Sequence, residues 1–299
     1  MATQAQAVFQ VSTPDRPGLV ARFAGFFFDL GVNIVDASHH AAASLEGTEP
    51  RFYMRIVVDL AGLSQPQALA KLGGSTSRRA LEEAFDQLAQ SLGARWEVSY
   101  ADVPDRVALF VTRESACLYD LVLRQQQGEL PCEIAFVAAN RPDLEHVANS
   151  FRLPFFCLPV TKETKRDQES QLLELVKRHH VNLVVLARYM QVLTDDFLQA
   201  APPVINIHHG FLPAFQGAKP YHQAFERGVK LVGATAHYAT KDLDQGPIIE
   251  QDVVRANHAM DPEELVRMGR DVERVVLARA VRAHLERRVF VDGRRTIIL

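Results

Sequence analysis

The stretch PVINIHH, residues 203–209, is a short apolar run that ends in polar side chains. Four comparable runs precede it along the chain: RVALFVT (106–112), CEIAFVAAN (132–140), FFCLPV (155–160) and VNLVVLARY (181–189). The segments between them have the spacing of helices, at 117–127, 141–151 and 165–180. Continuous apolar strands that alternate with helices are typical of a parallel sheet covered on both faces. Residues 101–299 therefore predict a doubly wound, mostly parallel α/β domain, with its site beyond the carboxyl ends of the strands.

The first hundred residues have a different order of elements. A strand from Ala7 is followed by a helix that ends at Gly31, two strands joined by a polar turn, a second helix and a last strand. This βαββαβ order predicts a ferredoxin-like unit, with a four-stranded sheet and its helices on one side. Pro104 and the charges around it separate this unit from the next apolar strand. We therefore predict two domains, residues 1–100 and 101–299.

Composition limits the class of protein. The chain of 299 residues is 47% hydrophobic and 23% charged, as ordinary globular proteins are. Its net charge of -3 provides no basic field for nucleic acid. Its three cysteines show no CxxC pattern, which predicts reduced thiols, and no apolar run has the length of a membrane span. The N-terminus lacks a basic segment followed by an apolar one, so we expect a cytoplasmic protein that binds neither membrane nor nucleic acid.

Two side chains in PVINIHH are candidates for chemistry. Side chains two apart on a strand point the same way, so Asn206 and His208 share one face and His209 lies on the other. An amide donor beside an imidazole can stabilise an oxyanion and exchange a proton with a leaving amine. The alternative is a strand end whose polar groups only satisfy the backbone of the following loop.

A carboxylate further along, Asp244, belongs to the loop TKDLDQGP (240–247) between two predicted strands. Aspartates in such loops usually form turns. A hairpin could instead return Asp244 to His208, where it would orient water or balance an imidazolium. A metal ion is a further alternative, because imidazole and carboxylate ligands could come from His208, His209, His222, His237 and Asp244. The chain has no HExxH motif, so we predict no metal site.

The two stretches INIHHGFLPAFQGAKPYHQAFERG (205–228) and GATAHYATKDLDQGPIIEQ (233–251) together resemble the folate-dependent formyltransferase fold. The resemblance implies a catalytic trio of Asn206, His208 and Asp244. The segment LARYMQVL (186–193) is similar to the part of this fold that lines the pterin pocket. Substrate contacts are accordingly expected from these residues: Arg188, Tyr189, Met190, Gln191, Val192, His209 and Gly217.

In the first unit, DRPG (15–18) at the first strand–helix turn and GVNI (31–34) before the second strand resemble an ACT domain. Domains of this family commonly pair with copies of themselves and bind amino acids at the paired interface. The resemblance implies a homo-oligomer with a small amino-acid effector, and regulatory contacts from Asp15, Arg16, Gly18 and Asn33. Local roles explain these residues equally well, with Asp15 as an N-cap, Pro17 in the first helical turn and Gly31 as a C-cap.

One departure from the formyltransferase pattern decides the expected reaction. Glycinamide ribonucleotide formyltransferases carry a Gly/Ser-rich phosphate loop after the first strand, where this chain reads VTRESACLYD (111–120), without a glycine. A backbone cradle for phosphate needs glycine, and Glu114 would repel the anion. An ACT domain followed by such a domain resembles the 10-formyltetrahydrofolate deformylase family. That resemblance implies hydrolysis of 10-formyltetrahydrofolate to tetrahydrofolate and formate, with the folate as substrate and no cofactor.

Two other functions stay open. The protein could transfer the formyl group to an unidentified amine, with an acceptor pocket near Arg113 and Glu114. It could also be an amino-acid-sensing regulatory protein whose α/β half has lost its activity.

Overall fold

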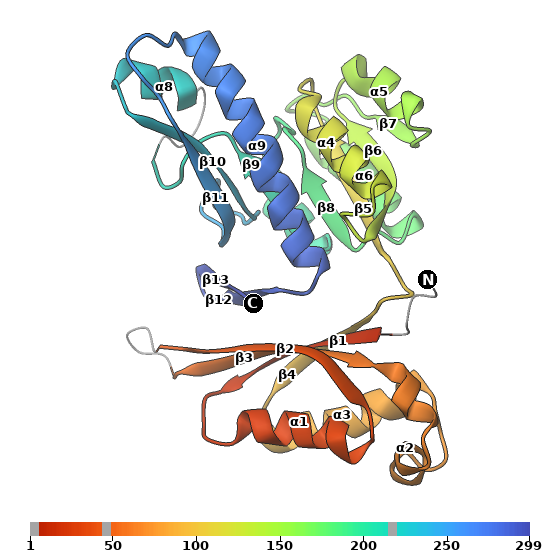
Figure 1. Ribbon diagram of the computed structural model, residues 1–299. Helices are drawn as coiled ribbons and strands as arrows, with labels where there is room; N and C mark the ends of the chain where they lie inside the picture. The colour runs from red at the N-terminus through yellow and green to blue at the C-terminus, as the bar shows by residue number, and fades with distance from the viewer. Residues whose placement is uncertain (1–5, 44–48, 215–219) are drawn as a thin grey trace. The chain divides into compact units, whose positions relative to one another are not determined.

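The computed structural model describes residues 6–43, 49–214 and 220–299, and the chain divides into two compact units after Pro104 (Figure 1). The first unit ends with strand β4 at Tyr100, and the second begins with strand β5 at Asp105. Each unit has its own hydrophobic core. Within the described residues, no helix is both long and apolar enough to cross a membrane.

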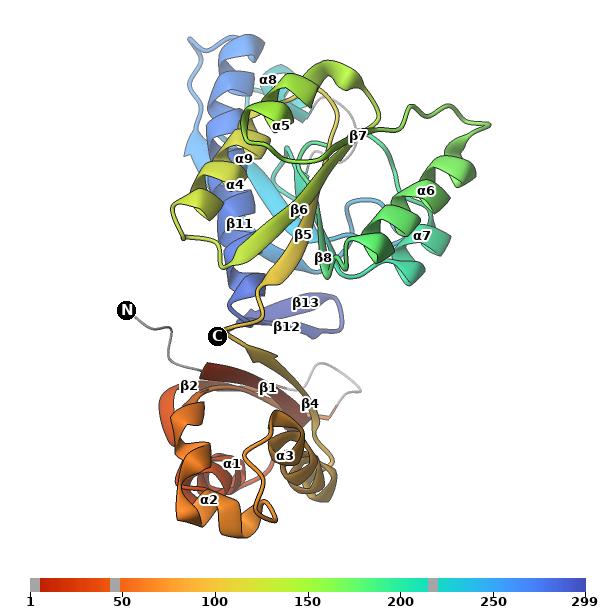
Figure 2. The same cartoon turned by 90° about the vertical axis from the view of Figure 1, so that its right-hand side faces the viewer.

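The N-terminal unit contains an antiparallel sheet with the strand order β2-β3-β1-β4. Its strands are β1 (Gln6–Pro14), β2 (Asn33–Ala42), β3 (Arg51–Asp59) and β4 (Arg95–Tyr100). Its helical elements are α1 (Leu19–Asp29), the 3-10 turn η1 (Leu60–Ser64), α2 (Pro66–Lys71) and α3 (Arg78–Leu92). Helices α1 and α3 lie on one face of the sheet (Figures 1 and 2). This is the βαββαβ order that the sequence predicts, with η1 and α2 as unpredicted additions between β3 and α3.

Aromatic packing and two glycines fix the position of α1. Phe9 of β1 lies against Phe27 of α1 and Phe85 of α3, with ring centroids 5.1 and 4.6 Å apart. The helix begins after Gly18 and is followed by Gly31, and both glycines have positive φ angles, 89° and 65°. The expectation that Asp15 is the N-cap is wrong, because Gly18 occupies the N-cap position. A left-handed backbone at that position excludes the extended geometry in which a side chain caps a helix.

The described part of the C-terminal unit forms a seven-stranded sheet in the order β11-β10-β9-β8-β5-β6-β7. Its strands are β5 (Asp105–Val111), β6 (Cys132–Ala139), β7 (Phe155–Cys157), β8 (Leu183–Leu186), β9 (Val204–His208), β10 (Leu231–Tyr238) and β11 (Ile248–Arg255). Strands β5 to β9 run parallel, whereas β10 is antiparallel to both of its neighbours. The predicted mostly parallel α/β sheet is therefore confirmed.

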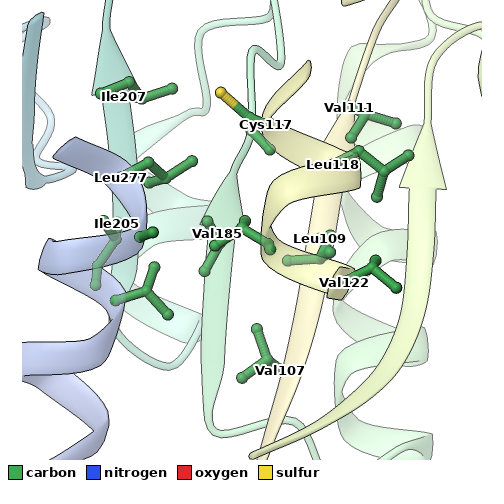
Figure 3. Packing of buried hydrophobic residues seen from close by; sticks show 14 of the residues in the cluster. Val107, Leu109, Val111, Cys117, Leu118, Val122, Val185, Ile205, Ile207 and Leu277 are labelled. Carbon is green, nitrogen blue, oxygen red and sulfur yellow. The ribbon is translucent and has the colours of Figure 1, made fainter. Parts of the chain in front are cut away.

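Helices cover both faces of this sheet (Figure 2). One face packs against α4 (Ala116–Gln126), α5 (Glu145–Ser150) and α9 (Pro262–Leu285), and the other against α6 (Lys165–Arg178) and α7 (Asp195–Ala200). Figure 3 shows the first of these layers, in which Leu277 of α9 lies beside Ile205 of β9 and Leu118 of α4 lies beside Val111 of β5. The remaining elements are the turn η2 (Pro142–Leu144), α8 (Pro220–Glu226) and the hairpin of β12 (Val289–Asp292) and β13 (Arg295–Ile298).

The strand order positions the site. The chain leaves β5 for β6 and β7 on one side, and then returns to β8 on the other side of β5. The switch point of the topology is therefore between β5 and β8. Ligands of such sheets usually bind beyond the carboxyl ends of the strands at this point.

Candidate active site

A pocket lies at the carboxyl ends of β8 and β9 and beside the loop that joins β10 to β11. Most of its lining comes from three places in the sequence: Arg188–Leu193 after β8, Asn206–His209 at the end of β9, and the region from His237 to Asp244. The structure thus brings together the predicted trio and most of the predicted substrate contacts. The exception is Gly217, which lies outside the described residues.

His208 and Asp244 form an ion-pair contact in the wall of this pocket. Nδ1 of His208 is 3.2 Å from Oδ2 of Asp244, and both side chains are almost fully buried. Asp244 has a φ of 56°, in the left-handed region that aspartate tolerates better than most residues. The loop is held close to β10 at Gly246, where a Cβ atom would lie 1.7 Å from the carbonyl oxygen of Tyr238. The hairpin therefore returns Asp244 to His208, the geometry that the sequence left open.

Asn206 is oriented by a residue that the sequence did not single out for this role, His237. The two are direct partners between β9 and β10, and the amide nitrogen of Asn206 lies 3.2 Å from Nε2 of His237. Nδ1 of His237 faces the carbonyl oxygen of Tyr238 at 2.9 Å, so Nδ1 carries the proton and Nε2 accepts one from Asn206. Burial lowers the pKa of His237, which keeps the ring neutral for this purpose. One amide N–H of Asn206 is thereby fixed, and the residue also lines the pocket.

His209 lines the same pocket but differs from His208 in its electrostatics. Burial lowers the pKa of His209 to about 3, and the nearby Arg188 guanidinium adds to this shift. Its ring centroid is 5.4 Å from that of His208. His209 therefore stays neutral at physiological pH and does not share in balancing the charge of Asp244.

The outer part of the pocket is apolar. Met190, Val192 and Leu243 line it with more than half of their surface exposed. The backbone N–H of Met190 donates to the hydroxyl oxygen of Thr112 at 3.0 Å, which ties this loop to the end of β5. Exposed apolar side chains around a few fixed polar groups are typical of a site for a mostly apolar organic ligand.

Tyr189 and Arg188 contribute to the pocket less directly than the sequence suggested. The ring of Tyr189 packs into the core against Phe110, and Gln168 donates to its hydroxyl oxygen at 2.8 Å. The guanidinium of Arg188 extends to Glu273 of α9, with Nε 3.4 Å from Oε2. Their positions in the loop still border the pocket.

Glu273 is a buried carboxylate that sequence reasoning missed. It is 1% exposed, and burial raises its pKa while Arg188 and a hydrogen bond from Tyr221 lower it. The Tyr221 hydroxyl donates to Oε1 of Glu273 at 2.8 Å. The segment around it looks like an ordinary charged helix. The sequence does contain a sign of its burial. Leu265, Gly269 and Glu273 are spaced four residues apart, so Glu273 lies on a face of α9 whose other residues are apolar or small.

The four regulatory candidates do not form one cluster within the N-terminal unit. Asp15, Arg16 and Gly18 follow the end of β1 that pairs with Arg51 of β3. Asn33 pairs with Asp59, at the opposite end of β3. Arg16 donates to the carbonyl oxygen of Leu92 at 2.8 Å, so its side chain has a structural contact of its own.

Among the described residues, no group of three or more histidine, cysteine, aspartate or glutamate side chains is placed to hold a metal ion. His222, one of the histidines considered for such a site, is exposed on α8 and does not line the pocket.

Comparisons with known proteins agree with this architecture. The formyl transferase family model matches residues 105–281. Formyltetrahydrofolate deformylase from Synechocystis sp. is 47% identical over 98% of both chains, and that from Bacillus subtilis is 43% identical over 96% of this chain and 92% of its own. The crystal structure of a formyltetrahydrofolate deformylase from Pseudomonas syringae has a TM-score of 0.91 at 41% identity, covering 100% of this chain and 96% of that one.

The second group of similar structures covers only part of this chain. Glycinamide ribonucleotide transformylase 1 from Symbiobacterium toebii has a TM-score of 0.62 at 30% identity, and it covers 66% of this chain and 94% of that one. The full-length matches are thus to proteins named for deformylation, and the partial matches include proteins named for formyl transfer. The chain belongs to the formyltetrahydrofolate deformylase family.

Proposed function

We propose that the protein hydrolyses 10-formyltetrahydrofolate to tetrahydrofolate and formate. The family supports this reaction, since the full-length relatives are named for it. The observation that carries the proposal is the arrangement of Asn206, His208 and Asp244 along one wall of the pocket. An amide donor, an imidazole and a buried carboxylate at that spacing are the groups that hydrolysis of an N-formyl group needs.

The reaction begins with a water molecule beside Asp244 and His208. The water oxygen attacks the formyl carbon, and one water proton passes to the His208–Asp244 pair. The resulting oxyanion accepts hydrogen bonds from an amide N–H of Asn206 and from protonated His208. His208 then gives a proton to the folate nitrogen as the carbon–nitrogen bond breaks. Formic acid loses its remaining proton to solvent, so all atoms of the folate, the water and the formyl group are accounted for.

Folate binding is assigned to the apolar part of the pocket. Met190, Val192 and Leu243 offer a surface for a flat ring, and the backbone of the loop from Arg188 to Val192 offers hydrogen-bonding groups at its edge. This arrangement places the ring beyond β8 and leaves the formyl group near Asn206 at the end of β9.

One assay separates this function from the alternatives. Purified protein is incubated with 10-formyltetrahydrofolate alone, and tetrahydrofolate and formate are both measured. Steady turnover with equal amounts of the two products is the expected result. Turnover that begins only when an amine is added would show a transferase, and no turnover in either case would leave a binding protein.

The N-terminal unit is assigned a regulatory role as an ACT-like domain that binds a small amino acid. Its βαββαβ order and its strand order support this assignment. Because Asp15–Gly18 and Asn33 are at opposite ends of β3, a ligand that touches both sets has to lie between two copies of the chain. Sedimentation of the protein with and without candidate amino acids, followed by the assay above, tests both the homo-oligomer and the effector.

A further inference from the structure

A buried polar cluster lies beside the reaction centre, at the place where this type of sheet usually binds a ligand. It consists of Arg188 after β8, Tyr221 on α8, and Gly269 and Glu273 on α9, and is called here the Arg188 cluster. The pocket described above lies beyond β8, β9 and β10, and its lining includes Arg188 but no described residue of the β5–α4 turn or of α9. The pocket therefore borders the switch point between β5 and β8 on the side of β8 only.

The cluster lies between the pocket and the first turn of α4. Arg188 borders the pocket, and its guanidinium reaches Glu273 on α9. Burial raises the pKa of the Cys117 thiol on α4, and Glu273 raises it further while Arg188 lowers it, so both charges are close to that thiol. Figure 3 shows Cys117 on the layer that α4 and α9 share, beside Ile207 of β9. The Arg188 side chain therefore runs from the pocket to α9, toward the layer that α4 and α9 share.

Several features of the Arg188 cluster are unfavourable for the stability of the folded protein. Arg188 has a φ of 64°, which is unfavourable for a residue with a Cβ atom. Its Nε and Nη1 atoms are buried and have no hydrogen-bond partner among the described residues. A buried ion pair with incomplete hydrogen bonding is weak support for a fold, because desolvation offsets the attraction. The presence of such a pair next to a reaction centre points to a role in the reaction.

The position of Tyr221 shows that the cluster depends on close packing. A Cβ atom at Gly269 would lie 2.1 Å from Cζ and the hydroxyl oxygen of Tyr221, so only glycine leaves room for this ring. Glu273 is one helical turn further along α9 and accepts the hydrogen bond from Tyr221. The ring of Tyr221 is also 6.2 Å from that of His209, which connects the cluster to the wall of the pocket.

We propose that the Arg188 cluster fills the second-substrate crevice beside the formyl group, so that water reaches the formyl carbon and an amine does not. This inference rests on the proposed hydrolysis and names the groups that make it selective. The cluster excludes an amine by occupying its volume, and the guanidinium also repels the ammonium form in which amines exist near neutral pH. Water needs no crevice, because it is small enough to enter beside Asp244.

Hydrolysis and transfer both release tetrahydrofolate, but only hydrolysis releases formate. In hydrolysis the formyl carbon bonds to the water oxygen, and the folate nitrogen takes up a proton as formate leaves. In transfer the carbon bonds to the amine nitrogen, the amine gives its proton to the folate nitrogen, and no formate is made. The ratio of formate to tetrahydrofolate is therefore the measure of selectivity, independent of the rate.

The experiment compares Arg188→Gly with Arg188→Met in the full chain, with glycinamide as the amine. Glycine adopts the positive φ of residue 188 without strain and opens the crevice, whereas methionine keeps most of the side-chain volume without the charge. Wild type and Arg188→Met are expected to give equal formate and tetrahydrofolate at every glycinamide concentration. Arg188→Gly is expected to give less formate than tetrahydrofolate once glycinamide is present, with formylglycinamide detected by mass spectrometry.

The outcomes test the proposed hydrolysis and the role of the Arg188 cluster separately. A wild-type protein that releases no formate refutes the proposed function itself. Equal products from Arg188→Gly at saturating glycinamide, or formylglycinamide made by the wild type, overturn the Arg188 cluster as the selective element while hydrolysis stands. If Arg188→Gly has no turnover, the rate at which iodoacetamide labels Cys117 tests whether the crevice is filled. This rate is measured by mass spectrometry of the peptide that contains Cys117. Faster labelling than in Arg188→Met supports a filled crevice, and an equal rate overturns it.

Discussion

The amide of Asn206 is held by His237 on one side and borders the pocket on the other, so its removal deletes a donor without leaving a buried charge. We expect Asn206→Ala to lower kcat by ~100–1000-fold, the usual effect of losing one oxyanion donor, with a smaller change in KM. Steady-state release of tetrahydrofolate measures both constants, and an unchanged melting temperature shows that the variant is folded. A wild-type kcat in a folded variant would refute the role given to Asn206.

The adjacent histidines provide a matched pair of variants. His208 contacts Asp244, whereas His209 is kept neutral by burial and Arg188. His208→Gln is expected to lower kcat by ~100-fold or more, as the loss of a general acid–base group does. His209→Gln makes the same chemical change one residue away and should reduce kcat much less, with its effect mainly on KM. Equal losses of kcat in the two variants would mean that strand alternation assigned the wrong histidine.

Sequence reasoning located some of these residues and missed others for physical reasons. Alternation predicts Asn206 and His208 on one face and His209 on the other, but β9 ends at His208 and both histidines line the pocket. The contact of Asp244 with His208 depends on a hairpin whose twist and length the sequence does not state. His237 was visible only as a histidine, because its role follows from the pairing of β10 with β9. Glu273 was hidden in a helix rich in charges, most of which are solvated.

At the scale of elements, the loop from β10 to β11 positions Asp244. Gly246 packs against the carbonyl oxygen of Tyr238, so Gly246→Ala must displace the loop. We expect this variant to lose most of its turnover and ~1–3 kcal/mol of unfolding free energy, as overpacked sites do. Urea unfolding and the deformylase assay measure the two effects.

Gly25 in α1 provides a control for the glycine-to-alanine substitution at Gly246. A Cβ atom at Gly25 meets nothing within 4 Å, and its backbone is helical. Gly25→Ala is expected to raise the unfolding free energy by up to ~1 kcal/mol through helix propensity and to leave turnover as in the wild type. If Gly25→Ala and Gly246→Ala behave alike, the close approach at Gly246 is not what positions Asp244.

The elements that the sequence predicted best are those with the strongest patterns. The buried strands β5, β6, β8 and β9 are continuous apolar runs, and such runs are recognisable without any tertiary information. Short elements such as η1, α2 and α7 span too few residues for a periodic pattern to emerge. The Arg188–Leu193 loop could equally have continued as a helix, and its actual path is set by tertiary contacts such as that of Thr112 with Met190.

Across the whole molecule, buried neutral histidines make folding sensitive to acid. Burial lowers the pKa of His284 to about 4, and its Nδ1 forms a hydrogen bond of 2.8 Å with the Tyr238 hydroxyl. Below the pKa of 6.5 that histidine has when unfolded, the unfolded chain binds a proton that the folded protein does not, so stability falls as the pH falls from 6.5 to about 4. His284→Gln keeps a hydrogen-bonding group for Tyr238 but cannot titrate.

We therefore expect the loss of unfolding free energy between pH 7 and pH 5 to be ~1–2 kcal/mol smaller in His284→Gln than in the wild type. Urea unfolding at the two pH values measures it. His258→Gln is the matched control, because it makes the same substitution at a histidine that is exposed. A wild-type pH dependence in His284→Gln, or the same reduction in His258→Gln, would contradict the assignment.

The division into two units leads to the last prediction, on a chain shortened to residues 105–299. All three residues of the proposed trio and the described lining of the pocket belong to the C-terminal unit, which also has its own core. Units of this kind generally fold alone, so the shortened chain is expected to hydrolyse 10-formyltetrahydrofolate with a kcat of the same order as the full chain. It should no longer respond to any amino acid that changes the activity of the full chain. The comparison uses both proteins in the same assay, with circular dichroism to show that the shortened chain is folded. A folded but inactive fragment would mean that the N-terminal unit supplies part of the site, and a retained response would place the effector on the C-terminal unit.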